Sequence, residues 1–265
     1  MFSKFQMVVK YLQYQLTASN SKGHGMHSPF VFDFIKNVLQ DDRTFYAYKQ
    51  IEQKRKAFLN NKTILKIKDL GAGSKTIPFK QRSIKSIATS SLKPKKFGQL
   101  LFRLVNYYQP NNILELGTSL GITSSYLAAA KTNAKVITLE GANEVATVAT
   151  KGFKELNLNN IELIEGNFDD TLSTAIHQLK TIDFAFIDGN HRYHPTVNYF
   201  NKILQISHNK TIIILDDIHW SSEMETAWNY AKNHSSVTAT IDLFFIGIVI
   251  LNNDFKVKQH FKVRF

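Results

Sequence analysis

Acidic side chains directly follow two apolar runs in the second half of the chain. Asp188 follows the run FAFI, and Asp216 and Asp217 follow the run IIIL. If both runs are parallel strands, their carboxyl ends lie at one edge of a sheet and the three carboxylates converge. Clustered carboxylates are costly unless a cation compensates their charge. Because carboxylate oxygens are hard ligands, we expect Asp188, Asp216 and Asp217 to bind Mg²⁺ or Ca²⁺. The alternative is that Asp216 and Asp217 cap the helix expected to begin at Trp220.

A histidine three residues after Asp188 is the candidate catalytic base. Histidine has an unperturbed pKa near neutrality, so His191 could accept a proton from a hydroxyl group beside the metal. His219, shortly after the second acidic position, is more simply explained as an ordinary loop histidine. The sequence therefore predicts one catalytic residue, His191.

A second candidate site lies where the apolar run ILEL ends in the turn GTSLG. A strand that breaks into a glycine turn and opens a helix is expected to leave backbone N–H groups free at a positive helix end. The next apolar run ends in Glu140, 19 residues after Gly121. A carboxylate at that distance can hold both hydroxyls of a ribose. Together these features predict a nucleotide-like cofactor.

The residues of the turn indicate which cofactor it is. The dinucleotide fingerprint needs a glycine at the position that Ser119 occupies, where the backbone approaches a pyrophosphate. Glu115, inside the end of the strand, would repel a diphosphate but suits a cationic methionine group. The same letters also read G-x-S-x-G, the nucleophile elbow of α/β-hydrolases, with Ser119 as the nucleophile. We disfavour this alternative because the preceding 110 residues show no clean βα alternation and no oxyanion loop. A second glycine-rich stretch, 69–74, predicts only a basic surface loop.

Composition sets limits on the class of protein. With 265 residues and 43% hydrophobic residues, the chain can build one α/β domain with an additional segment. No apolar run reaches membrane-spanning length and there is no cysteine, so we expect a cytoplasmic protein with no membrane contact. Residues 1–110 hold 20 Lys and Arg against 5 Asp and Glu, while the rest hold 13 against 16. This basic segment is either a solvated surface or a face for RNA or anionic substrates.

The elements that position these residues alternate regularly from Asn112 onward. Strands are predicted near 112–116, 135–139, 160–164, 182–187 and 210–215, and helices near 121–131, 142–155, 170–179, 194–205 and 220–233. The end of the chain is strand-like at 237–244, 246–251 and 257–265, with a hairpin turn at 252–254. The predicted fold is therefore α/β, a Rossmann-like seven-stranded sheet with an antiparallel C-terminal hairpin and an N-terminal helical segment. We expect a basic cap segment at 1–96, with helices near 1–20, 30–39 and 97–108, and a cofactor-binding domain at 97–265.

These motifs resemble a known family. The turn resembles motif I of class I S-adenosylmethionine-dependent methyltransferases. The stretches FIDGNHRY and IIILDDIHW are similar to the cation-dependent O-methyltransferases, in the branch with an F-I-D-G-x-H-x-Y pattern, over roughly 97–265. The first hundred residues and the ending KQHFKVRF resemble methyltransferases of Bacteroidetes-type bacteria.

The resemblance implies a role for each matching residue. S-adenosylmethionine would be bound through Glu115, Gly117, Thr118, Gly121, Thr123, Glu140, Asn167, Phe168 and Asp188, with Asn167 and Phe168 at the adenine. Asp188, Asp216 and Asp217 would bind the metal, Mg²⁺ or Ca²⁺, which would hold two substrate oxygens. Catechol-type relatives have lysine at the place of His191 and end the metal site in Asp-Asn, where this chain has Asp216-Asp217.

The sequence thus predicts metal-assisted O-methylation of a small-molecule hydroxyl. The first alternative is an RNA (tRNA) methyltransferase of the same fold that grips phosphates with its basic segment. A module that only binds S-adenosylmethionine is disfavoured, because it would not need the metal carboxylates or His191. We expect a small-molecule acceptor and allow for a homodimer.

Overall fold

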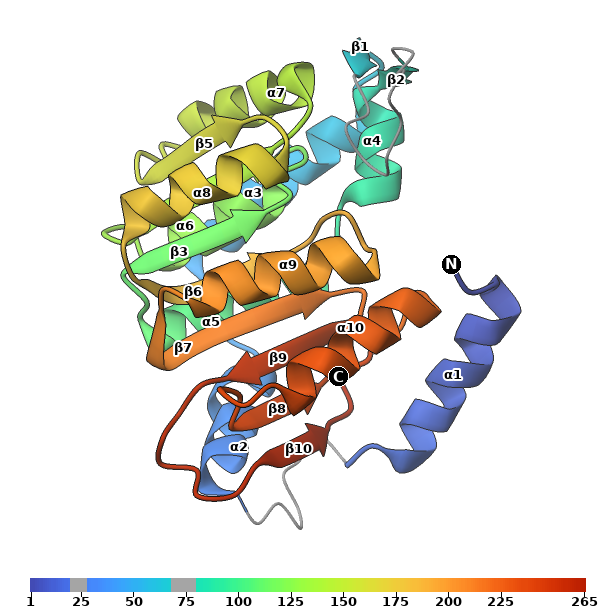
Figure 1. Ribbon diagram of the computed structural model, residues 1–265. Helices are drawn as coiled ribbons and strands as arrows, with labels where there is room; N and C mark the ends of the chain where they lie inside the picture. The colour runs from blue at the N-terminus through green and yellow to red at the C-terminus, as the bar shows by residue number, and fades with distance from the viewer. Residues whose placement is uncertain (20–27, 68–79) are drawn as a thin grey trace. The chain divides into compact units, whose positions relative to one another are not determined.

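The computed structural model describes residues 1–19, 28–67 and 80–265, and the glycine-rich stretch 69–74 lies outside them. The chain forms two compact units (Figure 1). Unit 1 comprises residues 1–41 and 180–265, and unit 2 comprises residues 42–179. The division at 96/97 expected from the sequence stays a prediction, because a compact unit is defined by contacts and not by independent folding.

Unit 2 contains a parallel three-stranded sheet with helices packed on it. Its elements in chain order are α3 (Tyr46–Asn60), β1 (Ile64–Ile67), β2 (Lys80–Ser83), α4 (Ile84–Ser91), α5 (Lys95–Tyr108), β3 (Asn112–Leu116), α6 (Ile122–Ala130), β4 (Lys135–Glu140), α7 (Asn143–Glu155), β5 (Ile161–Glu165) and α8 (Phe168–Leu179). β4 pairs in parallel with β3 and β5, with Leu116 opposite Leu139 and Glu140 opposite Glu165. The three strands therefore end at the same edge.

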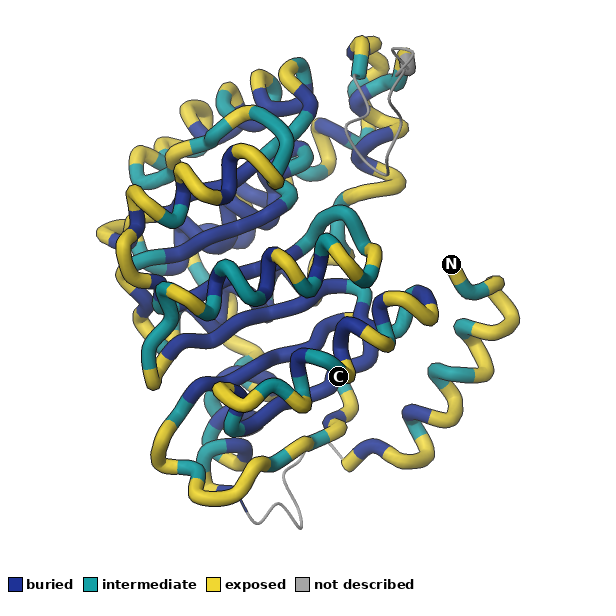
Figure 2. Tube along the Cα trace, in the orientation of Figure 1, coloured by how far each residue is buried: buried dark blue, intermediate teal, exposed yellow. Residues whose placement is uncertain are grey.

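The core of unit 2 is centred on α6, all of whose residues are buried. α6 contacts α5, α3 and β4, so it is covered on every side. A Cβ at Gly98 in α5 would lie 2.7 Å from the Tyr126 ring. Glycine at this position lets the two helices approach closely, which fixes the helix that follows the glycine turn. Figure 2 shows the buried strands beside helices whose outer faces are exposed.

Unit 1 contains a mixed sheet. Its elements are α1 (Lys4–Thr17), α2 (Pro29–Phe34), the π-helix η1 (Ile35–Leu39), β6 (Ile182–Ile187), α9 (Tyr193–Leu204), β7 (Ser207–Asp216), α10 (Ser222–Asn233), β8 (Ala239–Asp242), β9 (Ile246–Ile250) and β10 (Gln259–Lys262). β7 pairs in parallel with β6 and antiparallel with β9, and β9 pairs antiparallel with β8. Ile187 lies opposite Leu215, so the next residue of each strand falls at the same edge.

The predicted fold class is confirmed, including an antiparallel hairpin near the C-terminus. One detail of the prediction is wrong. The hairpin is made by β8 and β9, and the segment 252–254 does not turn β9 back onto a partner. Instead β10 pairs in parallel with β8, so it adds a further strand to the predicted seven-stranded arrangement. The residues before β10, such as the 72% exposed Val257, cross to the other side of β8.

The first helix belongs to unit 1 and lies against its C-terminal elements. Ser19 forms an isolated parallel bridge with Val263, and Tyr14 is buried against Phe244. Across the ranges that the structure describes, no helix combines the length and the apolar character needed to span a membrane.

Candidate functional site

The turn after β3 has the backbone that its glycines allow. Gly117 and Gly121 have φ of 105° and 78°, and Ser119 between them also has a positive φ, 47°. Gly121 is the N-cap of α6, and a Cβ there would lie 2.6 Å from the Phe153 ring. Both the conformation and the contact with Phe153 therefore require glycine at this position.

The N–H groups of this turn are bonded within the protein, which corrects the expectation that they are free. The amides of Gly117 and Thr118 both donate to the Leu139 carbonyl at 3.0 Å. Ser119 N–H donates to Glu140 Oε2 at 2.8 Å, and Gly121 N–H donates to the Thr118 carbonyl at 2.9 Å. Parallel pairing of β3 with β4 brings these groups together. With four amides engaged, the turn is unsuited to cradling a diphosphate, in agreement with Ser119 replacing the fingerprint glycine.

Glu140 ends β4 with its carboxylate turned back over the turn. Besides the bond from Ser119, its Oε1 accepts from the Ala142 amide at 2.9 Å. Burial raises the pKa of this carboxyl, and the hydrogen bonds from Ala142, Ser119 and Gly141 oppose the rise. A carboxylate has about four lone-pair sites and three amides bond to this one, so Glu140 retains acceptor capacity toward a ribose hydroxyl.

Glu115 and Thr118, both predicted to contact the cofactor, have side chains turned into the protein. Glu115 is fully buried, and its Oε2 accepts from the hydroxyls of Ser124 and Thr138. The Thr118 and Thr138 hydroxyls lie 2.6 Å apart. This buried network ties β3, the turn and β4 to α6. Thr123 lies in the first turn of α6 and is 9% exposed.

Asn167 and Phe168 follow the neighbouring strand end and begin α8. The Gly166 amide donates to the Glu140 carbonyl at 2.9 Å, which links this strand end to the predicted ribose carboxylate. Asn167 accepts from the Asp169 amide through Oδ1, at 3.2 Å, and Phe168 is half-buried. Unit 2 therefore carries every predicted cofactor residue except Asp188, at the ends of its three parallel strands.

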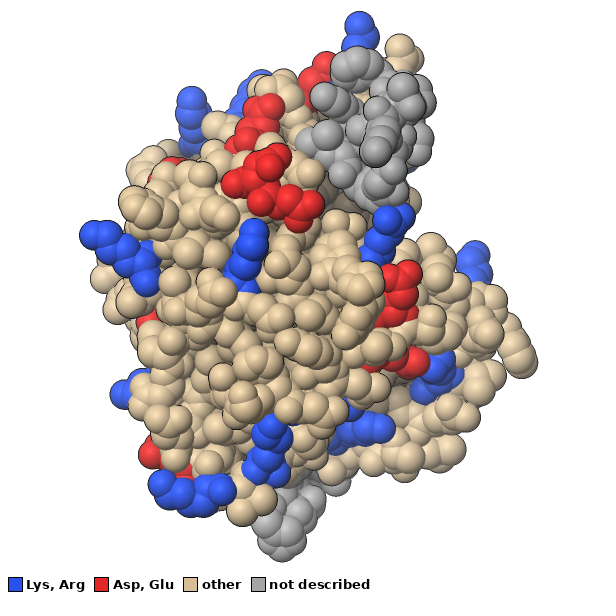
Figure 3. All heavy atoms as spheres, in the orientation of Figure 1, with Lys and Arg blue, Asp and Glu red and all other residues tan. Residues whose placement is uncertain are grey.

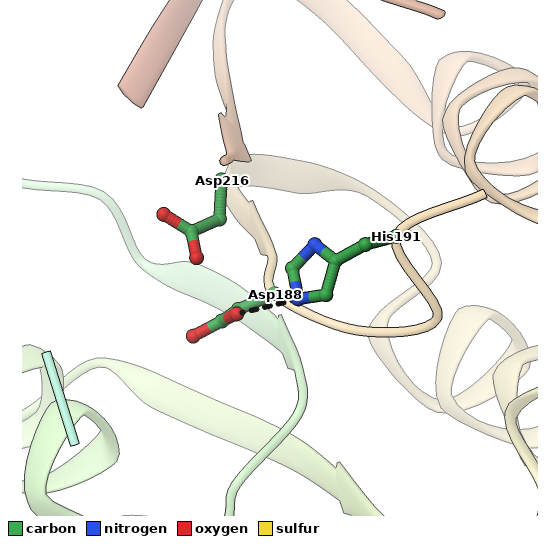
Figure 4. Close-up of side chains that lie close together, drawn as sticks. All are labelled: Asp188, His191 and Asp216. Atoms are coloured by element: carbon green, nitrogen blue, oxygen red, sulfur yellow. Dashed lines mark ion pairs between the residues drawn. The ribbon is translucent and has the colours of Figure 1, made fainter. Parts of the chain in front are cut away.

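The second group of predicted residues is assembled within unit 1. Asp188, His191 and Asp216 each place a ligand atom within 4.8 Å of the others, and Figure 4 shows the three side chains turned toward one another. The register of β6 and β7 explains this, because Asp188 and Asp216 follow the paired residues Ile187 and Leu215. Asp216 is fully buried, whereas Asp188 and His191 are half-buried.

Asp217 lies outside this group, although we expected three converging carboxylates. Its φ is 53°, so the backbone turns sharply after β7, and its amide donates to the Phe245 carbonyl at 2.7 Å. Among the described residues, the side chains that come close enough to share a metal ion are those of Asp188, His191 and Asp216, without Asp217. A metal-binding role for Asp217 stays a prediction.

The donor set of the group suits a divalent cation. Two carboxylates that approach this closely, one of them fully buried, repel each other unless a positive charge lies between them. Carboxylate oxygens favour Mg²⁺ or Mn²⁺, and an imidazole within the group is also compatible with Mn²⁺. The residues present therefore fit the predicted metal.

His191 is presented by a short loop between β6 and α9. In this loop Asn190 has φ of 60°, a left-handed backbone conformation that asparagine tolerates better than most residues do. His191 Nε2 lies 3.5 Å from Asp188 Oδ1, and its ring centroid lies 5.7 Å from that of Trp220. Sequence reasoning missed Trp220, because nothing local relates it to the β6–α9 loop. His219 lies apart from the group, bonded to Glu225 and Asp242.

Comparisons with known proteins relate this chain to methyltransferases. Residues 114–218 match the family model described as a methyltransferase domain. A catechol O-methyltransferase of Niastella koreensis is 33% identical over 126 residues, which are 46% of this chain. The aligned part is 55% of that protein, so the chain matches only about half of its relative's length.

Solved structures share the fold. The O-methyltransferase from Bacillus cereus, in complex with SAH, is 20% identical and has a TM-score of 0.56, covering 83% of this chain and 97% of that one. TomG from Streptomyces achromogenes, an O-methyltransferase in complex with SAM, is 17% identical, with a TM-score of 0.56 over 83% and 95%. Residues 114–218 therefore match a methyltransferase domain, and the chain shares the fold of these O-methyltransferase structures.

Proposed function

We propose that this protein transfers a methyl group from S-adenosylmethionine to the hydroxyl of a small molecule, assisted by a divalent cation. The observation that carries the proposal is the group formed by Asp188, His191 and Asp216 at the ends of β6 and β7. Such a group separates metal-assisted O-methylation from methyl transfers that need only cofactor binding. It also argues against a hydrolase that uses Ser119, because that reaction needs no metal carboxylates.

The cofactor would be bound by residues of unit 2. Glu140 would accept hydrogen bonds from the ribose hydroxyls, and Asn167 and Phe168 would flank the adenine. Gly117, Thr118, Gly121 and Thr123 would line the methionine end, with Glu115 supporting the turn from inside. The engaged amides of the turn support this assignment, since S-adenosylmethionine has no phosphate that would need them. Of the related structures, one contains SAH and another SAM.

The metal would be held by the carboxylates of Asp188 and Asp216, with Asp217 as the further ligand predicted from the sequence. When bound, Mg²⁺ supplies Lewis-acid chemistry that lowers the pKa of a hydroxyl and fixes its position. Methyl transfer from a sulfonium is an in-line displacement, in which the acceptor oxygen forms a bond to carbon as the carbon–sulfur bond breaks. Holding the acceptor along that line is therefore as important as removing its proton.

His191 would remove that proton. Its Nε2 faces Asp188, whose carboxylate can orient the imidazole and stabilise it once it is protonated. A base and a metal ligand at this position predict different behaviour. If His191 is the base, His191→Ala leaves metal affinity unchanged, whereas a ligand role requires that affinity to fall.

A small-molecule acceptor is favoured over RNA. The relative from Niastella koreensis is named a catechol O-methyltransferase, and catechols present two adjacent oxygens to a metal. On the face drawn in Figure 3, the Lys and Arg side chains of the described residues stand apart and form no continuous basic surface. RNA is therefore included among the acceptors to be tested and is not proposed as the substrate.

The test measures methyl transfer by the wild type, Asp216→Asn and Asp254→Asn over a range of Mg²⁺ concentrations. We expect Asp216→Asn to abolish methyl transfer while SAH binding, measured by calorimetry, is retained. Asp254→Asn, the same chemical change at an exposed aspartate of unit 1, is the control and should retain activity. Full activity of Asp216→Asn in the presence of a chelator would contradict the proposed role of the metal.

A further inference from the structure

The first helix is joined to the segment that follows the candidate ligand Asp216. The Phe2 amide donates to the Trp220 carbonyl at 3.0 Å, just before α1 begins. Lys10 Nζ donates to both carboxylate oxygens of Glu225 in α10, at 2.9 and 3.0 Å. The same ammonium lies 4.3 Å from the centroid of the Phe2 ring. Lys10 therefore connects the start of the chain with α10, beside which α1 runs in Figure 1.

The contact continues through His219 to the sheet. His219 Nδ1 lies 3.0 Å from Glu225 Oε1, and its Nε2 lies 2.9 Å from Asp242 Oδ2. Asp242, at the end of β8, is 4% exposed and accepts from the Phe244 amide at 2.8 Å through its other oxygen. Lys10, Glu225, His219 and Asp242 thus form one continuous network of ion pairs and hydrogen bonds.

The second half of α1 is anchored independently. The Tyr14 hydroxyl donates to the Val263 carbonyl and lies 3.1 Å from the Asp242 carbonyl. Burial raises the pKa of Tyr14, so the phenol remains a neutral donor at physiological pH. After the helix, the Ser19 amide donates to the Lys262 carbonyl at 2.9 Å. These bonds hold α1 in place whether or not Lys10 is paired, so Lys10 can be changed without releasing the helix.

The segment between Asp216 and α10, residues 217–221, is thereby held from two sides. The Phe2 amide and His219 connect it to α1 and α10, while the Asp217 amide connects it to Phe245. On its other side, the Trp220 ring lies against His191 of the candidate site. A shift of this segment would move both the residue next to Asp216 and the ring that packs on His191.

We propose that α1 positions the candidate metal site, with Lys10, Glu225 and His219 acting as positioning residues through segment 217–221. The effect on the metal site rests on the proposed function. The contact by which α1 holds segment 217–221 does not depend on it. None of these three residues belongs to the candidate metal group of Asp188, His191 and Asp216. They act by restricting where Trp220 and the backbone after Asp216 can lie.

The first test is deuterium exchange of the full-length protein, resolved to peptides covering 217–221. Lys10→Met keeps the length and helix propensity of the side chain but removes its charge. We expect it to raise exchange in 217–221 at least about threefold, with β6 and α9 unchanged. Lys4→Met, which alters an exposed lysine on the same helix, should change nothing, and Lys10→Arg should restore protection. Equal exchange in Lys10→Met and Lys4→Met, or a rise shared by the whole unit, would overturn the proposal.

The second test asks whether the held segment matters to the site. In Lys10→Met the Mg²⁺ concentration for half-maximal methyl transfer should rise at least about threefold, while the Kd for SAH stays at the wild-type value. An unchanged Mg²⁺ requirement alongside raised exchange would show that α1 holds the segment without positioning the site, which also overturns the proposal. If the wild type transfers no methyl group, the proposed function fails, and the exchange experiment still decides whether α1 holds the segment.

Discussion

At the scale of single residues, Glu140 carries the proposed recognition of the cofactor. Its two oxygens already accept amides of the segments on either side, from Ser119 and Ala142. These bonds fix the direction of the carboxylate before any ligand binds. The carboxylate is therefore already oriented when a ribose binds, and little conformational entropy is lost in fixing it.

Glu140→Gln should weaken SAH binding by about 1–3 kcal/mol, because it replaces a charged acceptor of the ribose hydroxyls with a neutral amide. Isothermal titration calorimetry measures this directly. Glu165→Gln is the matched control, since Glu165 lies opposite Glu140 at the end of β5 and is exposed. Equal losses in the two variants would remove Glu140 from the cofactor site.

The pH dependence of SAH binding follows from the burial of Glu140. Because burial raises its pKa, this carboxyl takes up a proton on acidification earlier than an ordinary glutamate does. The protonated group is a weaker acceptor, so the affinity for SAH should fall as the pH is lowered through that raised pKa. Calorimetry across acidic pH should show the fall in the wild type and a flat profile in Glu140→Gln; parallel profiles would rule this explanation out.

His191→Ala should lower kcat by about 10²–10⁴-fold, the usual range for a lost general base, with little change in SAH affinity. His194→Ala, an exposed histidine of the next helix, is the control. Initial rates over pH should also lose their acidic limb, which reports protonation of the imidazole. A kcat equal to that of the wild type on the true acceptor would remove His191 from the mechanism.

The residues of both sites could be found from sequence, because they are polar positions directly after apolar strands. Asp188, Asp216 and Glu140 are predicted in this way, and His191 is predicted from its place three residues after Asp188. Their geometry could not be found from sequence. Whether Asp217 faces Asp188 depends on a positive φ at one residue, and the engagement of the turn amides depends on how β3 pairs with β4.

At the scale of elements, the βα segments from residue 112 onward were predicted closely because their apolar runs are long and regular. Four elements before them were missed, namely α3, β1, β2 and α4. In α3 the charged run Lys54-Arg55-Lys56 interrupts the apolar face between Ile51 and Phe58, so the helical pattern is weak. β1 has only four residues and pairs with β2 across a gap of twelve, which no local pattern reveals.

Gly121→Ala should destabilise the protein by about 2–4 kcal/mol, because alanine is strained at φ of 78° and its Cβ would meet the Phe153 ring. Gly152→Ala is the control. It lies within α7, its Cβ would meet the flexible end of Lys54 at 3.3 Å, and helix propensity favours alanine by about 1 kcal/mol. In denaturant titration, the free energy of unfolding should be lower than that of the wild type for Gly121→Ala and higher for Gly152→Ala. Equal values for the two variants would show that the turn can relax.

At the scale of the whole molecule, the sequence could not show that residues 1–41 pack with 180–265. The contacts responsible join residues more than two hundred positions apart, such as Lys10 with Glu225. Local periodicity contains no information about such pairs. The excess of positive charge in the first 110 residues suggested RNA binding, yet Lys10 of α1 forms an ion pair with Glu225 within the protein.

The central claim is metal-assisted methyl transfer to a small-molecule hydroxyl. Its most direct test is mass spectrometry of products formed from S-adenosylmethionine with catechols, sugars and bulk RNA, each with Mg²⁺ and with excess chelator. We expect a catechol or a sugar to gain one methyl group only when Mg²⁺ is present, and Asp216→Asn to form no product. Methylation of RNA alone, or of any acceptor at an equal rate in chelator, would contradict it.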